Sequence, residues 1–513
     1  MANRKRIRQD RYRHTLVPVA VKPPCFSQRE KATMMRMTRI IIAFFLVAFA
    51  SCTTARTQKA GSDKKEKPSA LTRYVNADDG AYKWERVGEI KLPGGAVAYE
   101  LNLTSQKWRG ITWKHTVYVV RPEKVEKQPS LAVMMVLGGS NRDRKTGKLK
   151  EREPGQPRRR HLSNELRIVA QLANQVGLPI AGVMDIPNQP LFGGLREDDI
   201  IAHTFVKYFE TRDETWPLLL PMVKGAVKAM DAVEEFLKKD CDISISGFVV
   251  TGASKRGWTT WLTPVVDERV KAIAPIVYDN LDLRSQMKHQ LEMWGEFSRK
   301  IAPYTKRNLP QQLVEKEDWG TSLGEIVDPF TFREKLSLPK FIFIGTNDDY
   351  WPLDALNLYW GGLEGEKHVL YCPNDGHGLK NGMMTAVKSI IAFTLMVDRR
   401  LKWPKLVWEF AEINGRLSVR VGSDIEPLHV RTWVATSDST DFRESKWKPY
   451  GMKKEKTEYT YSYDRKSPEK GCVAILAVAT YSVDDDITYA LATNVKIFHS
   501  DKSRKSTVPA GKN

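Results

Sequence analysis

The sequence predicts a mostly parallel α/β sheet with helices on both faces, followed by a small C-terminal β-sandwich. Between about residues 131 and 397, continuous apolar runs alternate with helix-like segments, which is typical of repeated strand–helix units. Beyond Trp403 and Pro404 the helical pattern disappears, and about 95 residues carry short runs of alternating polarity instead. Such runs, separated by turns, favour a β-sandwich.

The parallel strands are predicted from apolar runs, because a strand that is buried on both faces has no polar side. The helices are predicted from apolar residues that recur on one face. Alternation over residues 96–122 indicates antiparallel strands at one edge of the sheet. The predicted buried strands cover residues 131–137, 179–183, 247–251, 270–277, 340–344 and 367–372, and the predicted helices cover residues 165–176, 221–239 and 382–397.

These elements set the predicted domain boundaries. The α/β domain covers residues 71–403 and includes an insertion at about 281–338. This insertion would lie above the carboxyl ends of the strands, where α/β proteins bind ligands. An Ig-like β-sandwich follows at residues 404–500, and residues 501–513 form a polar tail. The strands expected in the sandwich cover residues 416–421, 429–435, 457–463, 472–481 and 489–498.

Residues 1–51 resemble a leader and signal peptide rather than part of the fold. Arg36 and Arg39 precede an 11-residue apolar run that is too short for a comfortable transmembrane helix. The run from Phe49 to Cys52 resembles a bacterial lipobox, in which Cys52 would be lipidated after cleavage; a plain secretory signal is the alternative. Residues 52–70 form a polar tether. We therefore expect an exported protein, either a periplasmic or outer-membrane lipoprotein of a bacterium or a secreted protein.

The composition is that of a soluble globular protein, with 42% apolar and 28% charged residues among 513. The formal charge is +20, but no basic arm or zinc-finger pattern concentrates it, so nucleic acid is not an expected partner. The five cysteines show no spacing typical of zinc and are too few for a disulfide framework. No phosphate-binding or dinucleotide-binding glycine motif occurs, so we expect no cofactor and no metal.

A candidate nucleophile lies where a predicted strand ends, within residues 249–261 (VVTGASKRGWTTW). A serine hydroxyl attacks an acyl carbon only when a base takes its proton and its direction is fixed. A sharp strand-to-helix turn exposes such a side chain above the sheet, and small residues must surround so strained a turn. Gly252 and Ala253 precede Ser254, and Gly257 allows the following helix to pack closely. For this motif taken alone, a chance loop is the alternative.

An acid and a histidine follow in the order Ser, Asp/Glu, His, which is the chain order of α/β-hydrolases. Asp348 and Asp349 come after one predicted strand, and His377 comes after the next one, between two glycines. We prefer Asp348 as the acid, because patterns in this class place it a few residues beyond the strand and ahead of an aromatic-Pro segment. Asp349 is the alternative and Asp375 a distant third. His377 is the expected base, with a capping histidine as the alternative.

Acyl transfer also requires two hydrogen-bond donors for the developing oxyanion. The backbone N–H of Lys255, next to the candidate nucleophile, is expected to be one of them. The other is expected from Gly139 or Ser140, on the loop after the strand at 131–137, because a glycine can turn its N–H inward. An ordinary turn at the end of the strand is the alternative for this loop.

Further polar and aromatic residues are candidates for the edge of a substrate pocket. The segment Arg196-Glu197-Asp198 favours a structural ion-pair network over substrate contact. The side chains of Lys255 and Arg256 either reach the substrate or pair with carboxylates such as Asp231. The residues assigned to the substrate rim are Asn188, Gln189, Tyr350 and Trp351.

Together these segments resemble the PhoPQ-activated pathogenicity-related proteins, an α/β-hydrolase family of secreted or envelope bacterial proteins. The resemblance covers roughly residues 74–498 and depends most on residues 252–258 (GASKRGW). It implies an α/β-hydrolase fold with a β-rich C-terminal domain and leaves the substrate open. The turn at the serine also resembles that of carbohydrate esterases with a cation directly after the serine. The supporting segments are 187–190 (PNQP), 196–198 (RED), 221–222 (PM), 229–231 (AMD), 346–349 (TNDD) and 375–377 (DGH).

The predicted function is a serine hydrolase that cleaves an ester or amide bond through Ser254, His377 and Asp348, with an acyl-enzyme intermediate. The expected substrate is a small molecule, an acyl sugar or a peptide. A serine peptidase of the same fold is one alternative, because both activities are acyl transfer. A non-catalytic envelope lipoprotein that uses the fold for binding is the other, because a fold does not fix a function. Contact with a membrane is expected only through a lipid on Cys52.

Overall fold

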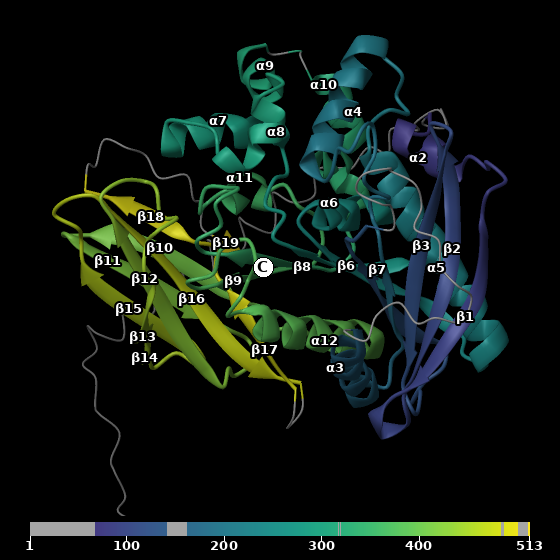
Figure 1. Ribbon diagram of the computed structural model, residues 1–513. Helices are drawn as coiled ribbons and strands as arrows, with labels where there is room; N and C mark the ends of the chain where they lie inside the picture. Colours follow the sequence, from purple (N-terminus) through teal and green to yellow (C-terminus); the bar gives the residue numbers. More distant parts are fainter. Residues whose placement is uncertain are drawn as a thin grey trace, which may run out of the picture. The chain divides into compact units, whose positions relative to one another are not determined.

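A nine-stranded sheet forms the centre of the α/β part (Figure 1). Its strands are β1 (Lys83–Lys91), β2 (Val97–Trp108), β3 (Ile111–Arg121), β4 (Ser130–Val136), β5 (Ile180–Val183), β6 (Ile245–Ala253), β7 (Val270–Ile276), β8 (Lys340–Gly345) and β9 (Lys367–Cys372). Their order is β1-β2-β3-β5-β4-β6-β7-β8-β9. The pairs from β1 to β3, and β3 with β5, are antiparallel. The remaining pairs are parallel, which confirms the predicted mostly parallel sheet with an antiparallel edge.

The computed structural model describes residues 67–140, 162–316, 318, 320–483, 487–500 and 511–512. The predicted leader, signal peptide and lipobox with Cys52, and most of the tether, lie outside these ranges. The α/β part and the C-terminal β-rich part belong to one unit, which begins at Pro68. No helix in the ranges given is long and apolar enough to cross a membrane.

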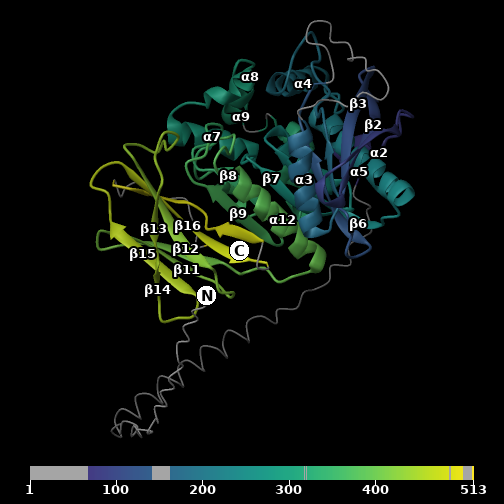
Figure 2. The same cartoon turned by 60° about the horizontal axis from the view of Figure 1, so that its bottom comes forward.

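Helices cover both faces of the sheet. On one face, α3 (Leu162–Val176) and α12 (Met383–Arg399) contact each other (Figure 2). On the other, α5 (Leu219–Cys241) contacts α6 (Lys255–Leu262). Because both faces are covered, all six residues of β8 are buried, as expected for a strand made of one apolar run. The predicted helices at 165–176, 221–239 and 382–397 agree with α3, α5 and α12.

Short helices between β7 and β8 lie above the carboxyl ends of the parallel strands (Figure 1). They are α7 (Leu283–Trp294), α8 (Ala302–Thr305), α9 (Leu309–Glu315) and α10 (Thr321–Val327). A helix that the sequence did not predict, α4 (Asp198–Thr211), lies at the same end of the sheet. The hydroxyl of Tyr304 in α8 donates to Asp198 of α4 at 3.0 Å and joins this helix to the insertion.

The C-terminal part consists of two antiparallel sheets. The first contains β10 (Val407–Ile413), β11 (Arg416–Gly422), β14 (Lys453–Lys454), β15 (Thr460–Lys466) and β19 (Gly511–Lys512). The second contains β12 (His429–Ser437), β13 (Lys448–Gly451), β16 (Cys472–Ser482), β17 (Thr488–Ala492) and β18 (Lys496–His499). The two sheets contact each other, since Tyr481 of β16 donates to Ser423 at 3.0 Å and the rings of Phe410 and Phe498 lie 6.5 Å apart.

Two details of this part differ from the prediction. The run at 489–498 forms two strands, β17 and β18, which pair one after the other with β16; the ladder is interrupted between them, where the Ala477 N–H donates to the side-chain oxygen of Thr493 at 3.0 Å. Within the predicted polar tail, Gly511 and Lys512 form β19, which pairs with the start of β10. Strand pairing uses backbone groups, so a polar sequence does not prevent it.

The junction between the two parts is apolar. Trp403 is only 5% exposed, and its ring lies 5.3 Å from that of Phe393 in α12 and 5.6 Å from that of Tyr489 in β17. Strand β17 also contacts β9. The β-rich part therefore packs beside β9, the edge strand of the large sheet.

The close packing of α6 on β7 gives a prediction about stability. A Cβ on Gly257 would lie 2.8 Å from the Cβ of Tyr278 and 3.0 Å from the carbonyl oxygen of Ile276, both too close for an unstrained side chain. We expect Gly257→Ala to lower the free energy of unfolding by about 1–3 kcal/mol, as overpacking does elsewhere. Chemical denaturation measures this change.

Gly361→Ala is the matched control. A Cβ on Gly361 would meet no heavy atom within 4 Å, and the residue has a φ of −64° that alanine adopts without strain. This variant should match the parent protein in stability. Equal stability of the Gly257→Ala and Gly361→Ala variants would contradict the packing argument.

Candidate functional site

Ser254 lies on a strained turn between β6 and α6. Its φ is 58° and its ψ is −121°, a backbone conformation that L-residues rarely adopt. Two hydrogen bonds hold the turn: the Ser254 N–H donates to Ile276 at 2.8 Å, and the Trp258 N–H donates to Ser254 at 3.0 Å. A Cβ on Gly252 would lie 2.7 Å from the carbonyl oxygen of Arg256, so the turn requires a glycine there. The motif thus has the geometry that its small residues predicted.

A chain of hydrogen bonds links Ser254 to a histidine and a carboxylate. The Ser254 Oγ lies 2.8 Å from Nε2 of His377, and Nδ1 of His377 lies 2.8 Å from Oδ2 of Asp348. The other carboxylate oxygen of Asp348 accepts the Tyr350 N–H at 2.9 Å. A carboxylate on one side of an imidazole places the ring proton on Nδ1, which leaves Nε2 able to accept a proton from a hydroxyl.

The structure separates the three carboxylates that the sequence offered as the acid. Asp348 is 6% exposed and contacts His377. Asp349 points elsewhere and pairs with Lys300 at 3.0 Å on the surface. Asp375 accepts the backbone N–H of Asn381 at 2.9 Å and so stabilises the loop that follows the histidine.

The ring of Tyr350 lies against the imidazole of His377. Their centroids are 4.1 Å apart and their planes differ by 30°, which is a stacked arrangement. Burial and the nearby carboxylates raise the pKa of Tyr350 well above its ordinary value, so the phenol is uncharged at neutral pH. The stacked ring limits the rotation of the histidine.

A second buried carboxyl group, which the sequence analysis did not single out, lies near this cluster. Asp279 follows β7 and accepts the hydroxyl of Tyr359 at 2.7 Å. Burial, with the charges of Asp348 and Asp354 nearby, raises the pKa of Asp279 to about 8. Asp279 is therefore largely protonated at neutral pH and adds little negative charge beside Asp348.

The two cations after the serine bind carboxylates from the segment at 196–198. Arg256 donates to both carboxylate oxygens of Glu197, at 2.7 and 2.8 Å, and its Nε donates to the carbonyl oxygen of Ile186 at 2.5 Å. Burial alone would raise the pKa of Glu197, but hydrogen bonds from Arg256 and Gln189 outweigh it and hold that pKa below its ordinary value. Glu197 thus takes part in a structural ion pair with Arg256, as the sequence predicted for the segment at 196–198.

Lys255 forms the second ion pair. Its Nζ lies 2.9 Å from Oδ2 of Asp198, and the same carboxylate accepts the hydroxyl of Tyr304. Asp231, which the sequence analysis named as a candidate partner, pairs instead with Lys228 and Arg269. Helix α5 places Asp231 away from the turn, whereas the start of α4 brings Asp198 to it.

The loop after β4 packs against the serine turn. A Cβ on Gly138 would lie 2.7 Å from a guanidinium nitrogen of Arg256, and one on Gly139, which has a φ of +151°, would lie 2.3 Å from Asp185. Ser140 donates its hydroxyl to the Gln189 carbonyl oxygen at 3.0 Å. Gly138, next to the expected donors Gly139 and Ser140, thus contacts Arg256. The other expected donor, the Lys255 N–H, begins α6 and lacks an intrahelical acceptor.

The four residues assigned to a substrate rim divide into two pairs. Tyr350 and Trp351 line a cavity beside the serine. Asn188 and Gln189 are at most 1% exposed and lie in the interior. The Asn188 amide donates to the carbonyl oxygen of Lys114 at 2.6 Å. The Gln189 amide donates to the carbonyl oxygen of Gly139 at 3.0 Å and to a carboxylate oxygen of Glu197 at 2.6 Å. These two amides therefore stabilise the loops under the site and do not contact a substrate, because their hydrogen-bonding groups are bound to the protein itself.

The β-rich part holds the loops that carry Asp348 and His377. The side-chain amide of Asn347 donates to three backbone carbonyls in residues 442–445, the shortest at 2.7 Å to Ser445. The side chain of Asn374 exchanges two hydrogen bonds with the backbone of Trp447, at 3.0 and 2.8 Å. Sequence reasoning missed this support, because no local pattern connects an asparagine to a loop almost 100 residues away.

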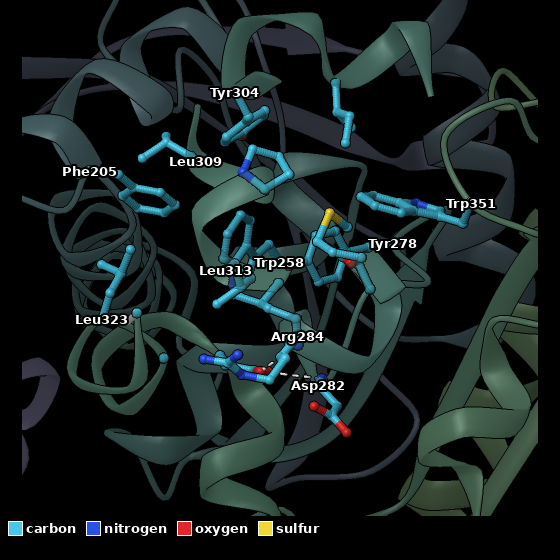
Figure 3. Close-up of a pocket in the computed structure, with 18 of the residues that line it drawn as sticks. Phe205, Trp258, Tyr278, Asp282, Arg284, Tyr304, Leu309, Leu313, Leu323 and Trp351 are labelled. Atoms are coloured by element: carbon cyan, nitrogen blue, oxygen red, sulfur yellow. Dashed lines mark hydrogen bonds between the residues drawn. The ribbon is translucent and has the colours of Figure 1, made fainter. Parts of the chain in front are cut away.

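A cavity of about 520 Å3 opens beside Ser254 and His377 (Figure 3). Its wall includes Lys255 and the ring of Trp351, together with side chains from the insertion. Within the described ranges, no group of three His, Cys, Asp or Glu side chains is placed to hold a metal ion. The site thus offers a hydroxyl, an imidazole, a buried carboxylate and backbone donors next to a cavity.

The strand order and the turn at Ser254 define an α/β-hydrolase fold, with Ser254, Asp348 and His377 after β6, β8 and β9. The family model for PhoPQ-activated pathogenicity-related protein matches residues 71–443. The chain belongs to this family, which confirms the resemblance seen in its motifs.

Several individual proteins are also similar to this chain. Autocrine proliferation repressor protein A of Dictyostelium discoideum is 31% identical over 466 residues, covering 83% of this chain and 90% of that protein. Acetyl xylan esterase 1 from Thermoanaerobacterium sp. is a similar solved structure, with 14% identity and a TM-score of 0.43 over 64% of this chain and 92% of its own. A glucuronoyl esterase from Solibacter usitatus has 13% identity and a TM-score of 0.37, with 64% and 91% covered.

The support from the β-rich part can be tested at Asn347. Asn347→Ala removes all three contacts to residues 442–445, so the adjacent Asp348 should lose its fixed position relative to His377. Misplacement by about 1 Å can lower a rate by about 100-fold. We expect a fluorophosphonate probe to label Ser254 at least tenfold more slowly in this variant. Labelling reactions that are quenched at successive times measure the rate.

Asn357→Ala is the control for that variant. Asn357 also joins the two parts, since its amide donates to Val495 at 3.1 Å and its carbonyl oxygen accepts from Asn494 at 2.8 Å. It lies away from the histidine, so its loss should lower stability without slowing the labelling of Ser254. Equal slowing by both variants would mean that Asn347 acts only through general stability.

Proposed function

We propose that this protein is a serine hydrolase that cleaves an ester or amide bond by acyl transfer. The main support is the continuous hydrogen-bonded chain from Asp348 through His377 to Ser254, with both links at 2.8 Å. The three residues come from three different strand ends, so that chance proximity is a poor explanation for their alignment. Residues held in a strained backbone conformation cluster at active sites, which agrees with a nucleophile at Ser254.

In the first half of the reaction, Ser254 Oγ attacks the carbonyl carbon while His377 Nε2 takes the hydroxyl proton. The resulting oxyanion accepts hydrogen bonds from the Lys255 N–H and from the Gly139-Ser140 loop. Asp348 stabilises the imidazolium without taking its proton. The bond to the leaving alcohol or amine then breaks, His377 returns the proton to that group, and the acyl group stays on Ser254.

The second half repeats these steps with water. His377 takes a proton from a water molecule, whose oxygen attacks the acyl carbon, and the same donors stabilise the second oxyanion. The bond to Ser254 breaks, and His377 gives its proton back to the serine oxygen. The products are a carboxylic acid and the regenerated hydroxyl.

The ion pairs of the two cations support this chemistry by fixing the turn. Arg256 connects α6 to Glu197 and packs against Gly138, so it sets the distance between the serine and the loop after β4. Lys255 is held by Asp198 at 2.9 Å, with its ammonium 5.9 Å from the centre of the Tyr350 ring.

The N-terminal residues support a further proposal, that the protein is exported and anchored by a lipid on Cys52. The basic residues, the short apolar run and the small residues before Cys52 resemble a lipoprotein signal. Expressed with its own leader in a bacterium, the protein should be found in the membrane fraction, and Cys52→Ala should release it or leave it unprocessed. An unmodified Cys52 in the purified protein would contradict this.

The hydrolase proposal predicts that Ser254→Ala abolishes both activity and labelling. We expect kcat/KM for an activated ester to fall at least about 1,000-fold, because the nucleophile is lost while the backbone donors remain. Peptide mapping after fluorophosphonate treatment should place the adduct on Ser254. A panel of esters and peptides then distinguishes an esterase from a peptidase. If the parent protein reacts with no probe and no substrate, the fold acts as a binding module.

Two adjacent carboxylates provide a matched test of the acid. Asp348→Asn should lower kcat by about 1,000-fold or more, since an amide favours the wrong histidine tautomer. Asp349→Asn removes only an exposed ion pair with Lys300 and should leave kcat near the parent value. Equal losses in the two variants would contradict the assignment of Asp348.

A further inference from the structure

The cavity beside Ser254 is larger and more apolar than a small acyl group requires. Its volume of about 520 Å3 lies within the range of pockets that enclose whole small-molecule ligands. An acetyl group would fill only a small part of it. The size of the cavity therefore indicates how large the substrate is, which the hydrogen bonds among Ser254, His377 and Asp348 do not.

Aromatic rings form one side of the cavity (Figure 3). The rings of Trp258 and Tyr278 stack with centroids 5.1 Å apart, and Phe205 meets the edge of Trp258 at 6.1 Å. The single polar atom of the Trp258 ring donates to the Val327 carbonyl oxygen at 2.5 Å. This wall offers a ligand mainly flat apolar surfaces, with the Tyr278 hydroxyl as a buried polar group within it.

Side chains from the insertion also line the cavity. Leu309 and Leu313 of α9 and Leu323 of α10 face the cavity (Figure 3). Several charged residues at its edges are already bound: Asp198 pairs with Lys255, Arg284 donates to the Lys316 carbonyl oxygen at 2.9 Å, and Asp328 accepts the Leu283 N–H at 2.8 Å. An apolar group would thus be buried without separating a charge from its partner.

We propose that this cavity binds the acyl part of the substrate, and that the acyl group is apolar and of medium length or aromatic. The proposal deepens the serine hydrolase function and depends on it. The order of steps in acyl transfer explains why the cavity would bind the acyl group and not the leaving group. The leaving group must depart, and water must enter on its side, before the second step can occur. The acyl group stays on Ser254 throughout, so an apolar cavity beside the serine suits it best.

The test compares two series of esters with the parent protein. The first contains p-nitrophenyl acetate, butyrate, hexanoate and octanoate; the second contains ethyl, butyl and hexyl acetates. We expect kcat/KM to rise by up to about fourfold for each added acyl methylene until the cavity is full, the factor that corresponds to burying one CH2. Lengthening the alcohol should have a much smaller effect.

Leu313→Trp fills part of the cavity and should lower the hexanoate-to-acetate ratio of kcat/KM by about tenfold. Glu315→Trp is the matched control, because it introduces the same ring on an exposed position of α9 outside the cavity, and its ratio should equal that of the parent. Fluorophosphonate titration counts the folded, reactive serines in each variant, so that misfolding does not imitate a change in specificity.

Each outcome has a definite meaning. A kcat/KM that falls along the acyl series, that rises only along the alcohol series, or that keeps its ratio in Leu313→Trp overturns the acyl-cavity proposal and leaves the hydrolase function intact. No hydrolysis of any ester together with no labelling of Ser254 overturns the hydrolase function and this proposal with it.

Discussion

The hydrogen bond between Asp348 and His377 is the interaction on which the rest of the site depends. It joins two loops from different strands, and the 6% exposure of Asp348 keeps water from competing for it. The surrounding groups all protect this contact: Tyr350 stacks on the imidazole, Asp279 is largely protonated, and Asn347 connects the loop to the β-rich part. The C-terminal sheets are thus part of the site's support, although none of their residues lines the cavity in the described ranges.

The turn at Ser254 needs a comparable support, because its backbone conformation is strained and would relax if unconstrained. Arg256 provides it by contacting Glu197, Ile186 and the Gly138 backbone together. A buried ion pair of this kind contributes little to stability in general, since desolvation offsets most of the Coulombic gain. Its value here is geometric: it fixes the loop after β4 relative to the serine.

The sequence was sufficient to place Ser254, Asp348 and His377, because their order along the chain follows from the strand order of the fold. It was insufficient where the outcome depends on tertiary contacts. Asn188 and Gln189 have the composition of a pocket rim, yet nothing local shows that both amides are buried. Strand β1 was missed because it is an exposed edge strand with few apolar residues. For the same reason the partners of Lys255 and Arg256, almost 60 residues upstream, could be identified only from the structure.

If Ser254 is the nucleophile, it is acylated during turnover, and rapid acid quenching captures this acyl-enzyme. The protein is mixed with p-nitrophenyl hexanoate, quenched within the first turnovers and digested for mass spectrometry. We expect a hexanoyl mass on the peptide that contains Ser254, and its absence from the same peptide of Ser254→Ala. Steady hydrolysis with no acyl group on Ser254, or with the acyl group on another residue, would show that Ser254 is not the nucleophile.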